Sequence, residues 1–265
     1  MTNYRRLVIK TGTSTLTHAN GALDLGSMDR LVRALSDIKN EGREVVLVSS
    51  GAIAAGVSGL GMPKRPTSLP YKQAAASIGQ CHLIHLYDKL FGEYGHTVGQ
   101  ILLTRTDIQS PDRRRNLENT FNALFDWSAL PVVNENDSVS SDEIEQGEQR
   151  LFSDNDTLSA AVAELIGADL LVLLTDIDAL YDADPRENPQ AKPIPIVHEV
   201  DEALLLKGGG AGSARGTGGM RTKLLAAKAA LSAGIDMVVA SGKQPERIQA
   251  FLQGESVGTL FTSNR

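Results

Sequence analysis

The chain has 265 residues, of which 42% are apolar and 22% charged, and its formal net charge is −6. A chain of this length can bury a large hydrophobic core without help from disulfides or structural metals. The acidic balance argues against a nucleic-acid-binding protein, and no apolar run approaches the roughly 18 residues that a membrane-spanning helix needs. We therefore expect a globular protein that binds neither nucleic acid nor membranes.

The cysteine content and the first residues predict the cellular compartment. Cys81 is the only cysteine, so no intramolecular disulfide can form, as is usual in reducing compartments. The segment Arg5–Lys10 is charged and strand-like, which is unlike the apolar core of a signal peptide. We expect a cytoplasmic protein.

Short apolar runs alternate with helical patterns along most of the chain. The predicted strands are Leu7–Ile9, Val45–Val48, Val98–Leu103, Pro131–Val133, Leu170–Leu174 and Met237–Ala240. The predicted helices are Leu25–Asn40, Tyr71–Phe91, one that begins at Ser110-Pro111, Thr157–Ile166 and Leu224–Ala233. Runs rich in Val, Ile and Leu are typical of strands buried on both faces. The repeated strand–helix–strand order predicts an α/β fold, a three-layer αβα sandwich around a mainly parallel sheet.

The pattern predicts a single domain over residues 1–265, built of two lobes, about 1–167 and 168–265. Two segments are predicted to be loops, the polar Ile144–Arg150 and the segment Gly56–Ser68. The most glycine-dense segment, Gly208–Gly219, predicts a mobile loop because glycine has few backbone restrictions. Trp127 follows an apolar stripe at helical spacing, so we expect it in the core.

Polar residues stand where several predicted strands end. Lys10-Thr11-Gly12 follows the first strand, Ser49-Ser50-Gly51 the second, Asn134–Asp137 the fourth and Thr175-Asp176 the fifth. Open parallel sheets bind ligands beyond the carboxyl ends of their strands. The sequence therefore predicts a binding site at one edge of the sheet.

Gly12 and Gly51 precede helical segments, where backbone N–H groups can bind an anion. Either glycine taken alone is equally compatible with an ordinary turn. No GxxxxGK[ST] motif is present, since glutamine follows Gly242-Lys243, and no GxGxxG follows the first strand. A P-loop or a dinucleotide-binding site is therefore disfavoured.

Lys10 and Lys223 are the candidate cations for a phosphate group. Lys10 ends a strand, where many lysines are simply exposed, and Lys223 follows the glycine-rich segment at a helix start. Asp154-Asn155-Asp156 could orient these lysines, or could only cap the helix that follows. Cys81, with His82 and His85, lies on a predicted amphipathic helix without a fourth ligand, so we expect no metal site there.

Seven motifs, taken together and in this order, resemble the amino acid kinase family over essentially the whole chain. They are KTGTS at Lys10–Ser14, VSSGAIAAG at Val48–Gly56, NENDSV at Asn134–Val139, FSDNDTLSA at Phe152–Ala160, LLTDIDALYDADPR at Leu173–Arg186, GTGGMRTKLLAAK at Gly216–Lys228 and SVGTLF at Ser256–Phe261. The NEND, DND and GTGGMxTK motifs are similar to those of members that phosphorylate glutamate. Many bacterial members continue into an RNA-binding-type PUA domain; only Thr262–Arg265 follow here, so we expect no such domain.

The resemblance implies ATP-dependent phosphorylation of the side-chain carboxylate of L-glutamate to L-glutamyl 5-phosphate, the first step of proline biosynthesis. It implies Mg²⁺ bound with ATP, inhibition by proline, and assembly into a homo-oligomer. Lys10 and Lys223 would stabilise the transferring phosphoryl group, and Asp156 would hold both lysines. The residues matching the glutamate-binding set are Ser50, Asp137 and Asn155. Those matching the nucleotide-binding set are Lys10, Gly12, Gly51, Thr175, Asp176, Thr217, Gly218, Gly219, Met220, Arg221, Thr222 and Lys223.

Three other functions stay open on the sequence. A sibling kinase of the same fold, such as an acetylglutamate kinase, would share most of these motifs. A non-catalytic nucleotide-binding sensor would not need both Lys10 and Lys223. A structural subunit would not need polar residues at several strand ends.

Overall fold

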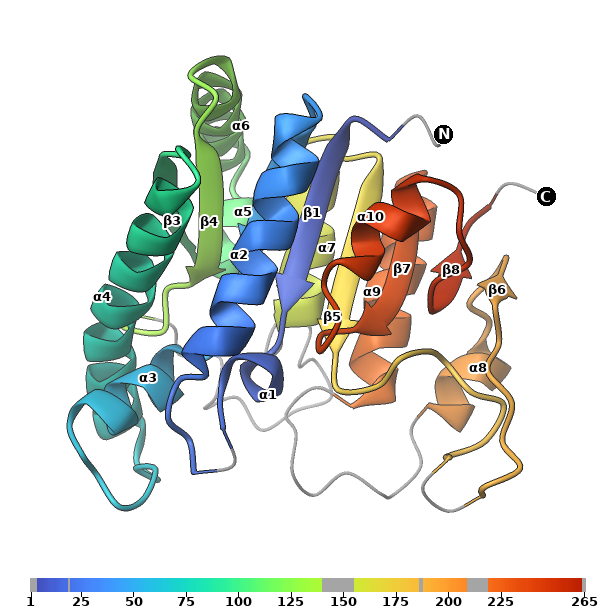
Figure 1. The fold of residues 1–265 in the computed structure, drawn as a ribbon, viewed down its shortest axis with the longest axis horizontal. Helices are drawn as coiled ribbons and strands as arrows, with labels where there is room; N and C mark the ends of the chain where they lie inside the picture. The colour runs from blue at the N-terminus through green and yellow to red at the C-terminus, as the bar shows by residue number, and fades with distance from the viewer. Residues whose placement is uncertain (1–3, 19, 140–154, 186–187, 209–218, 264–265) are drawn as a thin grey trace.

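A computed structural model describes residues 4–18, 20–139, 155–185, 188–208 and 219–263. Within these ranges the chain forms one eight-stranded sheet with helices on both faces (Figure 1). The strands are β1 (Arg6–Thr11), β2 (Glu44–Val48), β3 (Val98–Leu103), β4 (Leu130–Glu135), β5 (Leu170–Thr175), β6 (Ile196–Val197), β7 (Asp236–Ser241) and β8 (Thr259–Phe261). All six predicted strands are confirmed, with β6 and β8 in addition.

The sheet order is β3-β4-β2-β1-β5-β7-β8-β6. Every neighbouring pair for which a register is defined is parallel, except that β8 runs antiparallel to β7. The carboxyl ends of β1, β2, β4 and β5 therefore meet at one edge, the lower edge in Figure 1. In the register, Lys10 pairs with Val48 of β2 and with Leu173 of β5, so Lys10 lies centrally among these ends.

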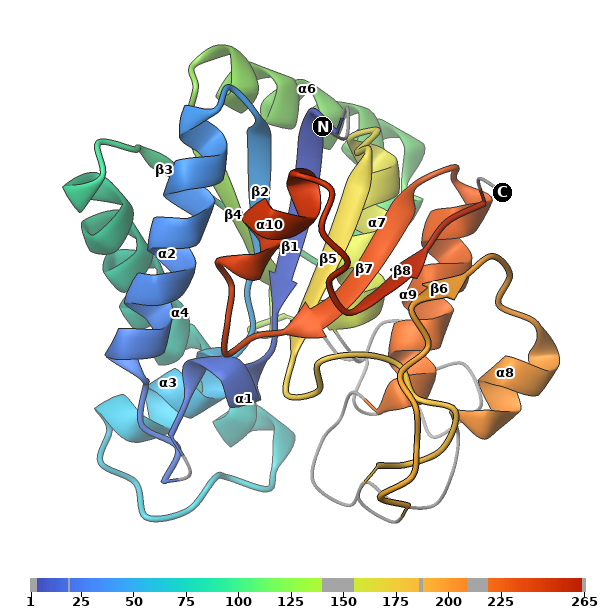
Figure 2. The ribbon, with the colours of Figure 1, turned by 45° about the vertical axis from the view of Figure 1, so that its right-hand side comes forward.

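The helices of the described residues are α1 (Thr13–Leu16), α2 (Leu25–Asn40), α3 (Ala52–Gly59), α4 (Leu69–Glu93), α5 (Arg105–Gln109), α6 (Pro111–Asp126), α7 (Asn155–Leu165), α8 (Glu202–Lys207), α9 (Met220–Ser232) and α10 (Arg247–Leu252). Buried side chains of α2, α3, α4 and α10 form the core on one face of the sheet. Those of α5, α6, α7 and α9 form the core on the other. Figure 2 shows α2, α4 and α10 in front of the sheet with α6, α7 and α9 behind it. The predicted three-layer αβα architecture is confirmed.

Alternation along each strand explains why both faces are apolar. Leu7 and Ile9 of β1 enter the core shared with α2 and α4, whereas Val8 between them enters the opposite core. Successive side chains of a strand point to opposite faces, so a strand covered on both sides needs an unbroken apolar run. This is the pattern that predicted the sheet.

Two local expectations are wrong. Trp127, expected in the core, is 78% exposed because α6 ends at Asp126 and the tryptophan lies in the turn that follows. The loop predicted at Gly56–Ser68 begins only after Gly59, because α3 continues through Gly56. The predicted loop at Ile144–Arg150 and most of Gly208–Gly219 lie outside the described residues.

None of the described helices combines the length and the apolar character that crossing a membrane would require.

Candidate active site

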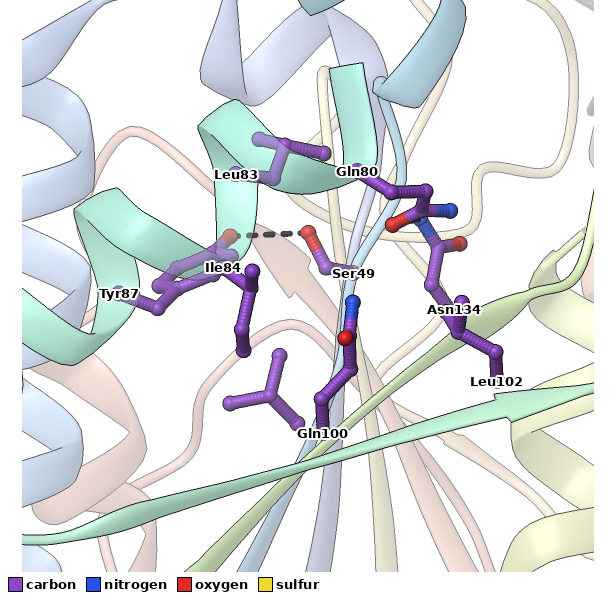
Figure 3. Close-up of a pocket in the computed structure, with 9 residues that line it drawn as sticks. Ser49, Gln80, Leu83, Ile84, Tyr87, Gln100, Leu102 and Asn134 are labelled. Carbon is purple, nitrogen blue, oxygen red and sulfur yellow. Dashed lines mark hydrogen bonds between the residues drawn. The ribbon is translucent and has the colours of Figure 1, made fainter. Parts of the chain in front are cut away.

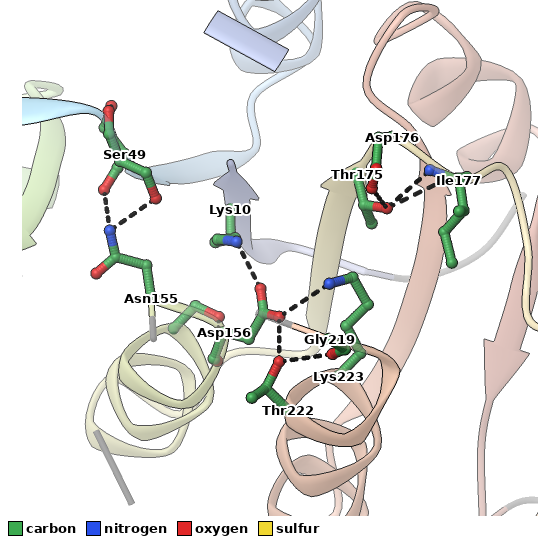
Figure 4. A network of polar contacts seen from close by, with 12 residues as sticks. Lys10, Ser49, Asn155, Asp156, Thr175, Asp176, Ile177, Gly219, Thr222 and Lys223 are labelled. Atoms are coloured by element: carbon green, nitrogen blue, oxygen red, sulfur yellow. Dashed lines mark hydrogen bonds and ion pairs between the residues drawn. The ribbon is translucent and has the colours of Figure 1, made fainter. Parts of the chain in front are cut away.

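The carboxylate of Asp156 lies between two lysine ammonium groups. Lys10 Nζ is 2.6 Å from Asp156 Oδ1, and Lys223 Nζ is 3.3 Å from Oδ2 (Figure 4). Lys10 lies near the end of β1, Asp156 in the first turn of α7 and Lys223 in the first turn of α9. Three distant segments of the chain therefore meet in one ionic cluster, which brings these three predicted residues together; their role in catalysis stays a prediction.

This cluster is buried, and its carboxylate is ionised. Asp156 is 1% exposed, and each lysine is 6% exposed. Burial by itself raises the pKa of Asp156, but the Lys10 and Lys223 ammonium groups outweigh that effect and hold its pKa below the usual value. The carboxylate thus stays ionised at neutral pH. Ammonium groups at such a site can also attract the oxygens of an anionic ligand.

Neighbouring polar groups hold Asp156 in place. The Thr222 hydroxyl lies 3.1 Å from Asp156 Oδ2 and 2.8 Å from the Gly219 carbonyl oxygen. The Ser159 hydroxyl donates to the Asp156 carbonyl oxygen at 2.6 Å. Asp156 therefore has a fixed position in the first turn of α7, and its carboxylate sets the positions of both lysines.

Gly12 and Gly51 stand at the starts of α1 and α3, and Gly12 lies beside Lys10. Gly51 has φ of +95°, a left-handed conformation that glycine adopts at little cost. A Cβ atom at Gly12 would lie 3.6 Å from Lys10 Nζ, so the glycine leaves space next to the ammonium group. Both turns have the geometry that was predicted; their binding of phosphate stays a prediction.

A second polar cluster surrounds Asn155, the residue before Asp156. Its Nδ2 donates to the Ser49 carbonyl oxygen and to Ser50 Oγ, both at 2.7 Å, and to Asn134 Oδ1 at 3.1 Å. The structure thus brings together Ser50 and Asn155, two residues of the expected glutamate-binding set, and their binding of glutamate stays a prediction. Asp137 lies in the turn after β4 and is partly buried. Asn134 was named from the sequence only as a polar residue at a strand end and as part of the NENDSV motif, without a role of its own.

The remaining predicted residues lie at the end of β5 and around the start of α9. Thr175 ends β5, and its hydroxyl accepts a hydrogen bond from the Ile177 backbone N–H at 3.0 Å, which turns the chain at Asp176. Gly219 is the N-cap of α9, and Met220, Arg221 and Thr222 form the first turn before Lys223. Thr217 and Gly218 lie outside the described residues.

The described residues contain no group of three or more His, Cys, Asp or Glu side chains arranged to hold a metal ion. Asp156, the buried carboxylate of the cluster, is paired with two lysines, which disfavours a cation beside it. We therefore derive no step through a protein-bound metal.

Comparison of the sequence with known proteins identifies the family of this chain. The sequence profile of the amino acid kinase family matches residues 5–241. This chain belongs to the amino acid kinase family. The chain is 52% identical over 261 residues to the glutamate 5-kinase of Clostridium acetobutylicum, covering 98% of this chain and 96% of that protein. It is 51% identical over 260 residues to the glutamate 5-kinase of Carboxydothermus hydrogenoformans, covering 98% of this chain and 68% of that protein.

The fold of this amino acid kinase also resembles solved structures. The carbamate kinase of Giardia lamblia bound to AMP-PNP superimposes with a TM-score of 0.68 at 15% identity, covering 99% of both chains. At this identity the likeness supports the fold alone. It agrees with the mainly parallel sheet between two helical layers.

Proposed function

We propose that this amino acid kinase transfers the γ-phosphoryl group of ATP to the side-chain carboxylate of L-glutamate. The product is L-glutamyl 5-phosphate, the first intermediate of proline biosynthesis. The observation that carries the proposal is the pair Lys10 and Lys223 on the two oxygens of Asp156. The comparisons support it, because the chain is 49% and 52% identical, over 98% of its length, to two proteins named glutamate 5-kinase.

The chemistry needs cations and positioning rather than a base. A carboxylate is ionised at neutral pH, so its oxygen attacks the γ-phosphorus without losing a proton. The new O–P bond forms as the bond to the β,γ-bridging oxygen breaks, and ADP leaves with that electron pair. Two anions must meet, and charge spreads over the transferring group. Electrostatic stabilisation and positioning dominate such transfers, and Lys10 and Lys223 supply two ammonium groups for this task.

The substrates are assigned to opposite sides of this ionic cluster. We place glutamate by the strand ends of the first lobe, residues 1–167, near Ser50 and Asn155, with Asp137 pairing its α-ammonium group. The nucleotide lies by the second lobe, residues 168–265, between the end of β5 and the start of α9. Mg²⁺ enters with ATP, held by phosphates and water.

Three further expectations belong to the same proposal. Proline inhibits by competing with glutamate, the chain assembles into a homo-oligomer, and the reaction takes place in the cytoplasm. The first rests on shared chemistry, since proline carries the same α-carboxylate and a cationic amine. The other two rest on the resemblance to the family and on the single cysteine.

Trapping of the acyl phosphate with hydroxylamine tests the proposal. With Mg·ATP, L-glutamate should give hydroxamate, whereas N-acetylglutamate and aspartate should give little. Acetylation removes the positive charge that Asp137 is proposed to bind. Comparable turnover of N-acetylglutamate would favour the sibling kinase, and ATP binding without turnover of any acceptor would favour a nucleotide sensor.

A further inference from the structure

Gln80 is a buried polar residue that none of the sequence motifs includes. It lies on α4 and is 7% exposed. Together with Ser49, Tyr87 and Asn134 it lines a small cavity between α4 and the sheet (Figure 3). A buried amide is costly unless both of its ends are hydrogen-bonded, so the partners of Gln80 indicate what its amide does.

Both ends of the Gln80 amide bind the carboxyl end of β4. Its Nε2 donates to the Glu135 backbone carbonyl oxygen at 3.1 Å, and its Oε1 accepts from Asn134 Nδ2 at 3.3 Å. A backbone carbonyl can only accept, so the NH₂ end of Gln80 must face Glu135. The acceptor end of Gln80 must then face Asn134.

The hydrogen bonds from Asn134 to Asn155 have an equally defined donor and acceptor. Asn134 Oδ1 accepts from the Glu135 backbone N–H at 2.9 Å and from Asn155 Nδ2 at 3.1 Å. A backbone N–H can only donate, which fixes the Asn134 amide from its other end. Asn155 Nδ2 also donates to the Ser49 carbonyl oxygen at 2.7 Å. Backbone groups thus set one direction for the whole chain of amides.

The packing of α4 keeps Gln80 within reach of β4. Gly79, its neighbour, packs directly on α3, where a Cβ atom would lie 1.7 Å from the Ala52 carbonyl oxygen. Gly56 makes the reciprocal approach, with a Cβ position 1.8 Å from the Ala75 carbonyl oxygen. This close crossing joins α4 to the helix that follows the Ser50–Gly51 turn.

We propose that Gln80 is a positioning residue for glutamate: through Asn134 it holds the Asn155 amide and Ser50 in the orientation that receives the substrate. This inference rests on the proposed function. Gln80 acts on one substrate because its hydrogen bonds lead to Asn155 and not to the lysines. Its loss should therefore change the KM for glutamate more than the KM for ATP or kcat.

Gln80→Met tests the inference in the purified full chain, because methionine has a similar unbranched length but no amide. We expect the KM for glutamate to rise about tenfold or more, as partners of a buried amide are left unpaired. The KM for ATP and kcat should stay within about twofold. Gln253→Met is the matched control, since Gln253 is exposed at the end of α10 and should leave all three constants unchanged.

Two more variants separate positioning from general damage. Gln80→Glu keeps the acceptor for Asn134 but cannot donate to Glu135 when ionised, so it should also raise the KM for glutamate, and it replaces Gln80→Met if that variant does not fold. Combining Gln80→Met with Asn134→Leu should raise this KM no further than the larger single effect, because both act in one network.

The outcomes are distinct. If the wild-type chain turns over glutamate and folded Gln80 variants keep its KM, or lose kcat and both KM values alike, the positioning role is wrong and the proposed function stands. If the wild-type chain makes no hydroxamate from glutamate, the proposed function fails, and the positioning role fails with it.

Discussion

Lys10 and Lys223, near opposite ends of the chain, bind the two oxygens of the same carboxylate at 2.6 Å and 3.3 Å. Neither lysine could occupy this buried position alone without a large desolvation cost. Asp156 offsets that cost, and the cluster lies at the edge of the sheet where the predicted phosphate-binding turns lie. The arrangement therefore links the fold of three separate segments directly to the proposed phosphoryl transfer.

Removing either lysine should reduce turnover more than binding. Lys10→Ala and Lys223→Ala should each lower kcat by at least about a hundredfold, the usual scale for losing one preorganised contact to the transition state. Lys228→Ala is the matched control, because Lys228 is exposed on the same helix as Lys223. Steady-state hydroxamate kinetics measure the effect. Near-normal turnover by folded Lys223→Ala would contradict the two-cation mechanism.

Asp156 should also matter for stability, with a defined pH dependence. Asp156→Asn leaves two buried ammonium groups without their carboxylate, so unfolding should become easier by about 3–5 kcal/mol at neutral pH. The folded-state pKa of Asp156 is lowered, so its stabilisation is complete above the unfolded pKa of about 4 and is lost as pH falls through the folded pKa. Denaturant titrations of both proteins should therefore converge at acidic pH. A difference that grows on acidification would contradict the ion-pair account.

The glycine pair at the crossing of α3 and α4 should be sensitive to one added methyl group. Gly79→Ala would push α4 from α3, with a cost of about 1–3 kcal/mol for overpacking and a raised KM for glutamate. Gly92→Ala is the control on the same helix, since nothing lies within 4 Å of its Cβ position. It should be neutral or slightly stabilising. Equal melting temperatures for the two variants would contradict the close packing of α3 against α4 at Gly79.

Inhibition by proline should be competitive with glutamate. Proline can use the same contact to Asp137 but has no side-chain carboxylate to receive phosphate. It should raise the apparent KM for glutamate and leave that for ATP largely unchanged. Asp137→Ala should weaken the binding of both glutamate and proline. Inhibition that is noncompetitive with glutamate, or that persists in Asp137→Ala, would place the inhibitor at a separate site.

The sequence predicted the sheet, and it placed the two lysines of the ionic cluster at one edge of that sheet, for physical reasons. Strands buried on both faces must be continuously apolar, so β1 and β5 were visible as runs, and the polar residues that end them had to converge. Lys10 and Lys223 stood out because each stands at the end or start of an element, whereas the choice of Asp156 within Asp154-Asn155-Asp156 came from the resemblance to the family. The two short strands β6 and β8 were missed because two or three residues carry no readable period.

The network behind the site could not be predicted in the same way. Gln80 and Asn134 act by hydrogen bonds across 54 positions of sequence, and an isolated glutamine on a helix gives no signal of its partner. A glutamine inside an otherwise apolar helix face was the available clue, since buried amides need partners. Trp127 was mispredicted for a different reason. Its helical spacing predicted a core position, but α6 ends at Asp126, so the tryptophan is exposed to solvent.

The most direct test of the account is the fate of a labelled oxygen. L-Glutamate carrying ¹⁸O in its side-chain carboxylate is incubated with the chain and Mg·ATP, and the acyl phosphate is cleaved with hydroxylamine. Attack of the carboxylate oxygen on the γ-phosphorus makes that oxygen the bridge, and hydroxylamine attacks the carbon, so the released phosphate should contain one ¹⁸O by mass spectrometry. Phosphate without ¹⁸O would contradict phosphorylation of the glutamate side chain.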